Sequence, residues 1–414
     1  MSTLYWQGTA AAVAQVANAT FATYDATTTR KITINGVVVS ALDTGGNLTA
    51  ALTAFAVVLN ASTNLYFSTI TWTSNATQII GTAKTAGIPF TFSGSASGGT
   101  GTCSNAYTVA TASAAPNDWS TATNWSTGAV PVTGDTVILK DNSISIAWGL
   151  AQSGVTLAKL RIDKTYTGRI GLARDFAQAI DGSSTTNTYT EYRTQYLQIS
   201  ATIVEIGQNF SATAASGSGR IKIDLGANAS TCTIFDCASS PSDTGQNAVQ
   251  LLANHASTDI FVRSAPGGLA IANGPGETST IRKVSISDTS TTSQVFCGPG
   301  TTLTTWFQDG GVNVISPAAT VTTITVNGGT LTTEGSSAVT TANINGGTLE
   351  SNSTGTITTL NVNGTSATVD LQQSNATRTV STLNLTKGIV KADGSIITFT
   401  AIAGAAGRYS LTAA

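Results

Sequence analysis

Six carboxylate side chains in the middle of the chain are of the type needed for general acid–base chemistry. Glycoside hydrolysis uses two carboxyl groups, which flank the bond that is broken. The candidates are Asp175, Asp181, Glu191, Glu205, Asp224 and Asp236. Glu191 is followed by Tyr192 and Arg193, and these three residues form a trio suited to face a glycan. The alternative, which we favour, is an ion pair between Glu191 and Arg193 beside a turn.

The single histidine, His255, is the one imidazole that a Ser-His-Asp or Cys-His mechanism could use. It lies in the segment LLANHASTD, and no Gly-x-Ser-x-Gly segment supplies a nucleophile elbow. We therefore expect His255 to have a structural role, in a turn or in a contact between subunits. We also expect the chain not to be an enzyme.

The sequence gives little support for metal binding or for a disulfide framework. The cysteines are few and scattered, at Cys103, Cys232, Cys237 and Cys297, and a single histidine leaves no zinc-ligand spacing. Neither an Asp-x-Asp-x-Asp-Gly loop nor a Gly-Gly-x-Gly-x-Asp repeat is present for calcium. We expect no metal, no other cofactor and buried free thiols, although the spacing of Cys232 and Cys237 leaves one local bridge open.

The charge content argues against nucleic acid and membrane surfaces as partners. Charged residues make up 10% of the 414-residue chain, and 19 basic against 21 acidic residues leave a net charge of -2. No run of 18 apolar residues occurs, and the first 20 residues lack the pattern of a signal peptide. The polar surface must come from Thr, Ser, Asn, Gln and Gly, a composition that favours strands and turns.

A repeated segment in the last hundred residues indicates a solenoid. The chain reads VTTITVNGGTL at 321–331 and VTTANINGGTL at 339–349, which is 18 residues later. An interval of 18 is too short for a two-helix repeat but holds two or three short strands, and the apolar residues alternate. We therefore predict a mainly β chain whose body is a right-handed parallel β-helix with coils of about 18 residues.

The repeat assigns inward and corner positions to individual residues. The predicted inward positions are Val321, Ile324, Val326, Val339, Ile344, Ile357 and Leu360. Gly328 and Gly346 mark corners, because glycine tolerates positive φ. Trp306 stands where other coils have Ile, Ala or Leu, which assigns it to the core. A column of asparagines can form hydrogen bonds along the axis: Asn327, Asn345 and Asn363.

The first part of the chain has a mixed pattern that predicts a small α+β domain. Asn35 and Gly36 lie between two β-branched runs, which predicts a hairpin. Residues 48–59 show helical spacing, and Asn47 can cap them. We predict three parts: an N-terminal domain at 1–113 for attachment or interaction, a β-rich body at 114–302, and regular coils with the C-terminal end at 303–414.

The body opens with a tryptophan-containing segment at 117–139, NDWSTATNWSTGAVPVTGDTVIL. Trp119 and Trp125 can cover the open end of a solenoid, while Pro131 and Asp135 turn the chain into the first strand. The segment resembles the opening found before β-helical repeats in bacterial surface proteins and in phage virion proteins. The resemblance implies that these four residues form a cap.

Further segments resemble a family of structural proteins of tailed phages. They are GLAQSGVTLAKLRIDKTYTGRIGL at 149–172, EYRTQYLQI at 191–199, GSGRIKIDLG at 217–226 and NHASTDIFV at 254–262. The N-terminal domain also resembles a module of phage structural proteins, on ITINGVVVS, AALTAFAVVLN and GTAKTAGIPFTFS. No catalytic residue carries over from this family.

The resemblance implies a virion protein on the outer surface of the particle. Within the family we expect a capsid decoration, or cement, protein that forms a homotrimer and binds the major capsid protein or another virion protein. The alternative is a tail spike or fibre that binds host surface glycan, with or without the ability to cleave it. Neither alternative involves nucleic acid or a membrane.

Overall fold

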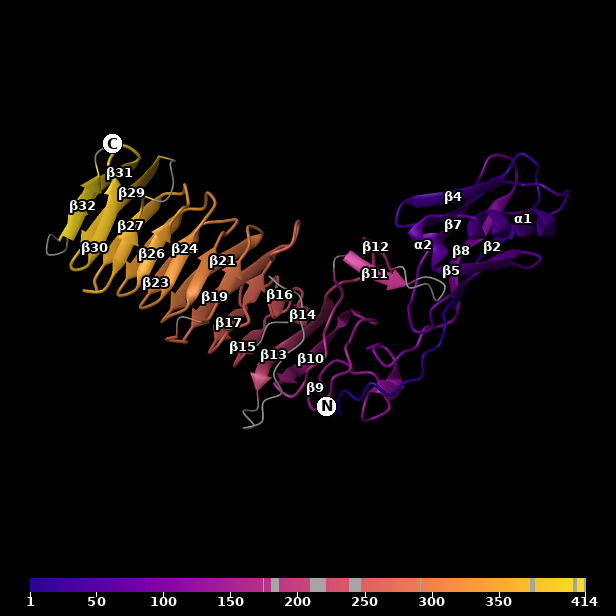
Figure 1. Ribbon diagram of the computed structural model, residues 1–414, viewed down its shortest axis with the longest axis horizontal. Coiled ribbons are helices and arrows are strands. Elements are labelled where there is room, and N and C mark those ends of the chain that lie inside the picture. Colours follow the sequence, from indigo (N-terminus) through magenta and orange to yellow (C-terminus); the bar gives the residue numbers. More distant parts are fainter. Residues whose placement is uncertain are drawn as a thin grey trace.

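The chain forms a long rod of stacked coils with a small domain beyond the N-terminal end of the rod (Figure 1). The computed structural model describes residues 1–173, 175–179, 186–208, 221–237, 247–290, 292–372, 377–404 and 408–412. Strands account for 50% of the chain and helices for 6%, which confirms the mainly β prediction. No helix in these ranges is long and apolar enough to cross a membrane.

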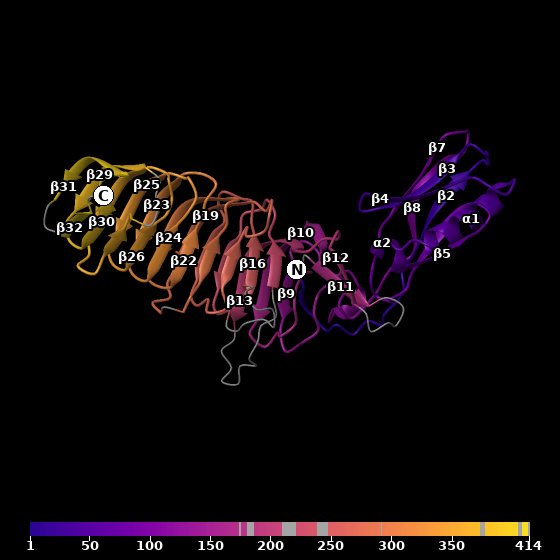
Figure 2. The ribbon, with the colours of Figure 1, turned by 45° about the horizontal axis from the view of Figure 1, so that its top comes forward.

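The rod is a parallel β-solenoid built from two main sheets, each of which gains one strand per coil (Figure 2). The first sheet contains β9 (Thr136–Leu139), β10 (Ala151–Asp163), β13 (Leu197–Gln208), β15 (Thr231–Ile234), β17 (Asp259–Val262), β19 (Ser279–Ile286), β21 (Thr301–Gln308), β23 (Val321–Val326), β25 (Val339–Ile344), β27 (Ile357–Val362), β29 (Arg378–Leu385) and β31 (Ile397–Ala403). The second contains β14 (Ile221–Asp224), β16 (Val249–Leu252), β18 (Leu269–Ile271), β20 (Val295–Cys297), β22 (Val312–Ile315), β24 (Thr330–Thr333), β26 (Thr348–Ser351), β28 (Thr368–Asp370), β30 (Ile389–Asp393) and β32 (Arg408–Thr412). A separate antiparallel pair is formed by β11 (Asp175–Ala179) and β12 (Thr186–Thr190).

The predicted coil length of 18 residues is wrong for the solenoid as a whole. About ten turns occupy residues 136–403, and the coil length is about 22 residues and not 18. Ile324 lies opposite Ala342, 18 residues further on, but Cys232 lies opposite Ile260, 28 residues further on. The earlier coils carry longer loops, and these loops hide the period from the sequence. The right-handed sense of the coil stays a prediction.

The core of the solenoid is the column of inward side chains that the repeat assigned. Val321, Ile324, Val326, Val339, Ile344, Ile357 and Leu360 are all buried. Trp306 is fully buried, which confirms its assignment to the core, and its indole nitrogen donates a hydrogen bond of 2.9 Å to Gln308. Each coil therefore buries its apolar face only against its neighbours, as repeat architectures require.

The corner glycines are needed for two different reasons. Gly347 has φ of 65°, a conformation that favours glycine. Gly346 has no positive φ, but a Cβ there would lie 2.4 Å from the carbonyl oxygen of Asn327 in the preceding coil. Gly328 meets the carbonyl of Asp309 in the same way. At Gly328 and Gly346 the close approach of the neighbouring coil, and not positive φ, therefore requires glycine.

Asparagine side chains form two ladders along the axis. The predicted column is confirmed, because Asn345 donates to Asn327 at 3.0 Å and Asn363 donates to Asn345 at 3.2 Å. A second ladder of 2.8 Å hydrogen bonds runs through Asn343, Asn361 and Asn384. In each ladder the side-chain amide of one asparagine donates to the side-chain oxygen of the asparagine in the preceding coil. These hydrogen bonds help to fix the register between coils.

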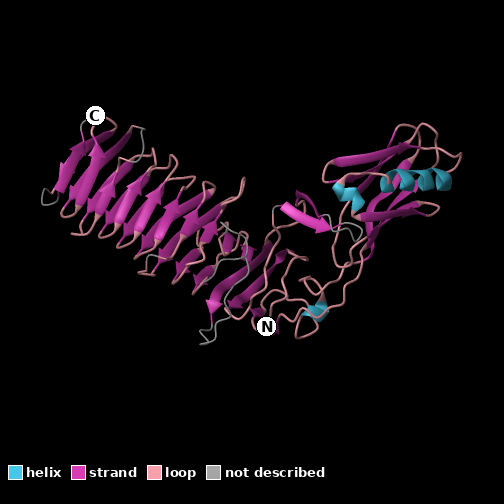
Figure 3. Cartoon of the chain, in the orientation of Figure 1, coloured by secondary structure: helices cyan, strands magenta, loops and turns pink. Residues whose placement is uncertain are grey.

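The small domain carries the two α-helices of the described chain (Figure 3). Its antiparallel sheets contain β5 (Ile70–Ser74), β6 (Gln78–Ala83), β2 (Val16–Ala22) and β8 (Thr102–Thr111), and separately β4 (Val37–Leu42), β3 (Thr29–Ile34) and β7 (Ser93–Ser97). The predicted helix and hairpin are both present. Helix α1 (Leu48–Asn60) is capped by the Asn47 side chain, and Asn35 and Gly36 join β3 to β4 with positive φ. Helix α2 (Leu65–Ser68) is a single turn after α1.

The start of the chain belongs to the solenoid and not to the small domain. Strand β1 (Thr3–Tyr5) pairs in parallel with β9, and Leu4 and Trp6 lie in the solenoid core. The core of the small domain begins only at Ala17. The predicted unit 1–113 is therefore wrong at its start, because the domain is inserted between the first strand of the solenoid and its cap. We call it the inserted domain below.

Candidate functional site at the joint between the two domains

Glu191 and Arg193 form a buried ion pair at the N-terminal end of the solenoid. The guanidinium of Arg193 donates from Nε to Oε1 of Glu191 at 2.7 Å and from Nη2 to Oε2 at 2.8 Å. The backbone N–H of Arg193 also donates to Oε1 at 2.8 Å. The Glu191 side chain is 0% exposed. The prediction that Glu191, Tyr192 and Arg193 face a glycan is therefore wrong for the carboxylate, since both of its oxygens are enclosed and hydrogen-bonded.

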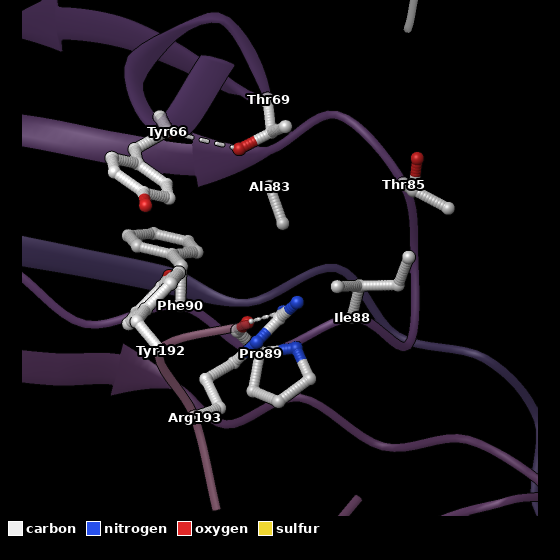
Figure 4. Close-up of a pocket in the computed structure, with 9 residues that line it drawn as sticks. All are labelled: Tyr66, Thr69, Ala83, Thr85, Ile88, Pro89, Phe90, Tyr192 and Arg193. Carbon is white, nitrogen blue, oxygen red and sulfur yellow. Dashed lines mark hydrogen bonds between the residues drawn. The ribbon is translucent and has the colours of Figure 1, made fainter. Parts of the chain in front are cut away.

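Arg193 also joins the solenoid to the inserted domain. Its Nη1 donates a hydrogen bond of 2.8 Å to the carbonyl oxygen of Pro89 (Figure 4). Its guanidinium also lies 4.4 Å from the ring centroid of Trp148. Next to it, the rings of Tyr192 and Tyr66 meet edge to face, with centroids 5.3 Å apart. Arg193 thus makes a charged hydrogen bond and a cation–π contact, and Tyr192 adds an aromatic pair with the inserted domain.

Two chain segments connect the domains and are themselves paired. Val13 and Ala114 form an antiparallel bridge in which the Val13 N–H donates to the Ala114 carbonyl at 2.8 Å. Gly87 donates from its N–H to the Val13 carbonyl at 3.0 Å. With the contacts of Arg193, these bonds fix the inserted domain at both of its connections. The joint is therefore a braced connection and not a single flexible linker.

Two hollows flank Arg193, and they differ in what they can hold. The first, lined by Tyr66, Ile88, Phe90 and other side chains, has about 10 Å³ for a guest, which suits one water molecule (Figure 4). The second is a cleft of about 280 Å³ beside Trp148. The guanidinium of Arg193 lies over the Trp148 ring, and both residues line this cleft.

The predicted cap residues lie at the N-terminal end of the solenoid. The rings of Trp119 and Trp125 meet edge to face with centroids 4.6 Å apart, and both are buried. Pro131 is buried, and the carboxylate of Asp135 accepts hydrogen bonds from the N–H groups of Ser2 and Val132. Sequence reasoning missed β1, which covers the edge of β9 and protects that strand from pairing with another chain.

Three of the other five candidate carboxylates have structural partners among the described residues. Glu205 pairs with Lys159 at 3.1 Å, Asp236 pairs with Lys164, and Asp224 accepts the N–H of Gly226 in a turn at 2.9 Å. Burial is the main cause that raises the pKa of Asp224. Asp175 lies at the start of β11, and Asp181 lies outside the described residues.

His255 and the cysteines show no catalytic arrangement in the described ranges. Nδ1 of His255 accepts the N–H of Ser257 at 3.0 Å in a turn, which is the structural role predicted for it. All four cysteines are free thiols, so Cys232 and Cys237 are not bridged. No group of three or more metal-ligating side chains gathers within the part of the chain that the structure describes.

The contacts at Pro89 and Trp148 were not predictable from the sequence. Pro89 contributes its backbone carbonyl, which every residue type has, so the sequence does not reveal this contact. Trp148 lies singly within an apolar segment, which is typical of a core residue. No family model, no curated protein and no solved structure matches the chain. The function therefore has to be argued from the residues and their arrangement.

Proposed function

We propose that the chain is a structural protein of a tailed-phage virion and that it decorates the outer surface of the capsid. The proposal rests on the resemblance of its segments to phage structural proteins. It is supported by a solenoid whose coils pack through inert apolar columns and asparagine ladders. In this proposal the major capsid protein, or another protein of the shell, is the partner.

The observation that carries the proposal is the braced joint at Arg193. A cement protein must transmit load between the shell and its own body, and many modest contacts on a symmetric lattice then add up to stable attachment. Arg193 and the paired connectors make one stiff unit from the rod and the inserted domain. We infer that the inserted domain contacts the shell and that the solenoid stands outward.

We also propose that the chain assembles as a homotrimer through contacts between copies of itself. In a symmetric trimer each copy makes the same contact with the shell, so the number of contacts triples without a new type of interface. Sedimentation-velocity analytical ultracentrifugation of the purified chain measures the oligomeric state directly. A mass of three chains supports this part of the proposal, and a monomer at micromolar concentration contradicts it.

The number of copies per particle tests the capsid position. Quantitative mass spectrometry of purified particles should find hundreds of copies, comparable with the major capsid protein. Chemical cross-linking of intact particles should join lysines of the inserted domain, such as Lys31 and Lys84, to the shell. Detection of only a few copies per particle would indicate a position in the tail. Absence of the protein from purified particles would overturn the proposal.

The second candidate function is a tail spike or fibre that binds host surface glycan, with or without cleaving it. The observation in its favour is the long outer face of the first sheet, along which an extended polymer can lie. Release of shorter sugars from host polysaccharide by the purified chain would support cleavage. Glu191→Gln is not the test for that activity, because Glu191 is enclosed at the joint.

A further inference from the structure

Four neighbouring strands of the first sheet, together with the residues that directly follow two of them, carry aromatic and basic side chains on their outer face. The strands β15, β17, β19 and β21 follow one another along the rod (Figure 1). Phe261 lies opposite Ser285, which lies opposite Phe307, so a small residue separates two rings. The two Phe positions are therefore two strand spacings apart, or roughly 9.5 Å.

Two cations accompany these rings. The ammonium of Lys283 lies 5.7 Å from the centroid of Phe261 and 5.9 Å from that of Phe307, so it sits between them. The guanidinium of Arg263 lies 5.1 Å from the centroid of Phe235, one strand away. We call Phe235, Phe261, Arg263, Lys283 and Phe307 the outer strip.

The carboxylates beside the strip are already paired with other cations, and Asp236, which follows Phe235, pairs with Lys164. Asp259 lies opposite Lys283, but Asp259 accepts two hydrogen bonds from Arg282, at 2.8 and 2.5 Å. Neither Lys283 nor Arg263 lies within ion-pair distance of a carboxylate among the described side chains. The strip therefore offers two cations to an external anion.

We propose that the outer strip binds a polysaccharide that carries carboxylate groups. The flat rings provide stacking surfaces for the C–H faces of sugar rings, and Lys283 and Arg263 pair with carboxylates. The strip runs along successive strands, so it suits an extended polymer. This inference does not depend on the position of the protein in a particle, because a capsid decoration and a tail spike both expose this face.

Single-stranded nucleic acid is the competing ligand class, since bases also stack on aromatic rings. Proteins that bind it combine stacking with a groove of many basic residues. This chain has a net charge of -2, and the strip contains only two unpaired cations. Two cations on a chain of net negative charge do not form the basic groove that single-stranded nucleic acid requires, so these observations favour a carboxylated polysaccharide.

Affinity electrophoresis of the full-length chain in gels containing polygalacturonate, alginate, hyaluronate or neutral dextran tests the proposal. The three carboxylated polymers serve as probes, and at least one of them should retard the chain while dextran does not. Lys283→Ala should weaken the retardation. The double variant Phe261→Thr with Phe307→Thr should weaken it by about tenfold or more. Threonine already occupies the matching positions Thr233 and Thr325, so the solenoid accepts it.

Lys140→Ala is the matched control, because Lys140 also lies over an aromatic ring, 5.3 Å from the centroid of Tyr5, but outside the strip. It should bind like the unaltered chain. Failure of all three carboxylated polymers to bind would overturn the proposal, as would binding that Lys283→Ala and the double variant leave unchanged. Stronger retention by single-stranded DNA than by every polysaccharide would replace the proposed ligand class with nucleic acid. Far-ultraviolet circular dichroism confirms that each variant is folded.

Discussion

Arg193 in the solenoid donates a hydrogen bond of 2.8 Å to the carbonyl of Pro89 in the inserted domain, although the two residues lie 104 positions apart in the sequence. The same guanidinium neutralises the enclosed carboxylate of Glu191. One side chain thus satisfies a charge within the solenoid and fixes a second domain against it. This double role makes the joint sensitive to a single substitution.

Arg193→Ala should destabilise the chain by about 3–5 kcal/mol, because it leaves the buried charge of Glu191 without a partner. Urea denaturation measures the loss, and limited proteolysis should show faster cleavage of the connectors near Val13 and Ala114. Arg282→Ala is the control, since Arg282 is 56% exposed and its ion pair should contribute less than about 1 kcal/mol. Equal losses in the two variants would contradict the role given to Arg193.

Gly347→Ala should destabilise the solenoid by about 3 kcal/mol, since the new Cβ adds a clash to an unfavourable φ. The Cβ would lie 2.4 Å from the carbonyl oxygen of Gly329. Gly276→Ala is matched to it, because Gly276 has φ of 76° but open space around a Cβ. This control should lose only about 1–2 kcal/mol. If thermal unfolding ranks the two variants in the opposite order, contact between coils is not the constraint at the corner.

Asn361→Thr should cost about 2 kcal/mol, because Asn361 both donates to Asn343 and accepts from Asn384. Threonine occupies the same outer column at Thr325, so the change keeps a residue that this sheet tolerates. Thr359→Val, two residues earlier on the same strand, should change the unfolding free energy by less than about 0.5 kcal/mol. Similar effects of both substitutions in urea denaturation would show that the ladder adds little stability.

The repeat explains which of these features the sequence could predict. The Asn327 ladder was predictable because each of its residues directly precedes a glycine that marks the corner of its coil. The Asn343 ladder has the same interval but no such marker, and threonine and phenylalanine replace asparagine in the earlier coils. Helix α1 was predictable from its cap at Asn47 and its apolar spacing, which are local signals.

Contacts between distant segments account for what the sequence did not reveal. Strand β1 has only three residues, and its partner Thr136 lies far along the chain, so neither periodicity nor turn residues indicated the pairing. The ion pair between Glu191 and Arg193, which we favoured over a trio that faces a glycan, is confirmed. Its place at the joint depends on a backbone carbonyl of Pro89, which no pattern of side chains can encode.

Asp25 should make the inserted domain less stable in acid. Hydrogen bonds from the backbone and side chain of Thr27, followed by those of Thr100, hold the pKa of the Asp25 carboxyl well below its usual range. A depressed pKa stabilises the folded state above the ordinary carboxyl pKa, and this contribution is lost as pH falls toward the folded value. Asp25→Ala should therefore be less stable than the unaltered chain at pH 6, and the difference should shrink below about pH 4. A difference that is constant with pH in thermal unfolding would contradict the assignment.

Three of the four thiols should be inert in the folded chain. Burial raises the pKa of Cys232, Cys237 and Cys297 to about 12, so almost no thiolate forms near neutral pH, and the side chains are enclosed. Cys103 is only partly buried, although burial also raises its pKa, and it should react first. Iodoacetamide labelling followed by peptide mass spectrometry should modify Cys103 alone in the native chain and all four residues in guanidinium. Labelling of Cys232 or Cys237 without denaturant would contradict this prediction, because both sulfurs are enclosed in the folded chain.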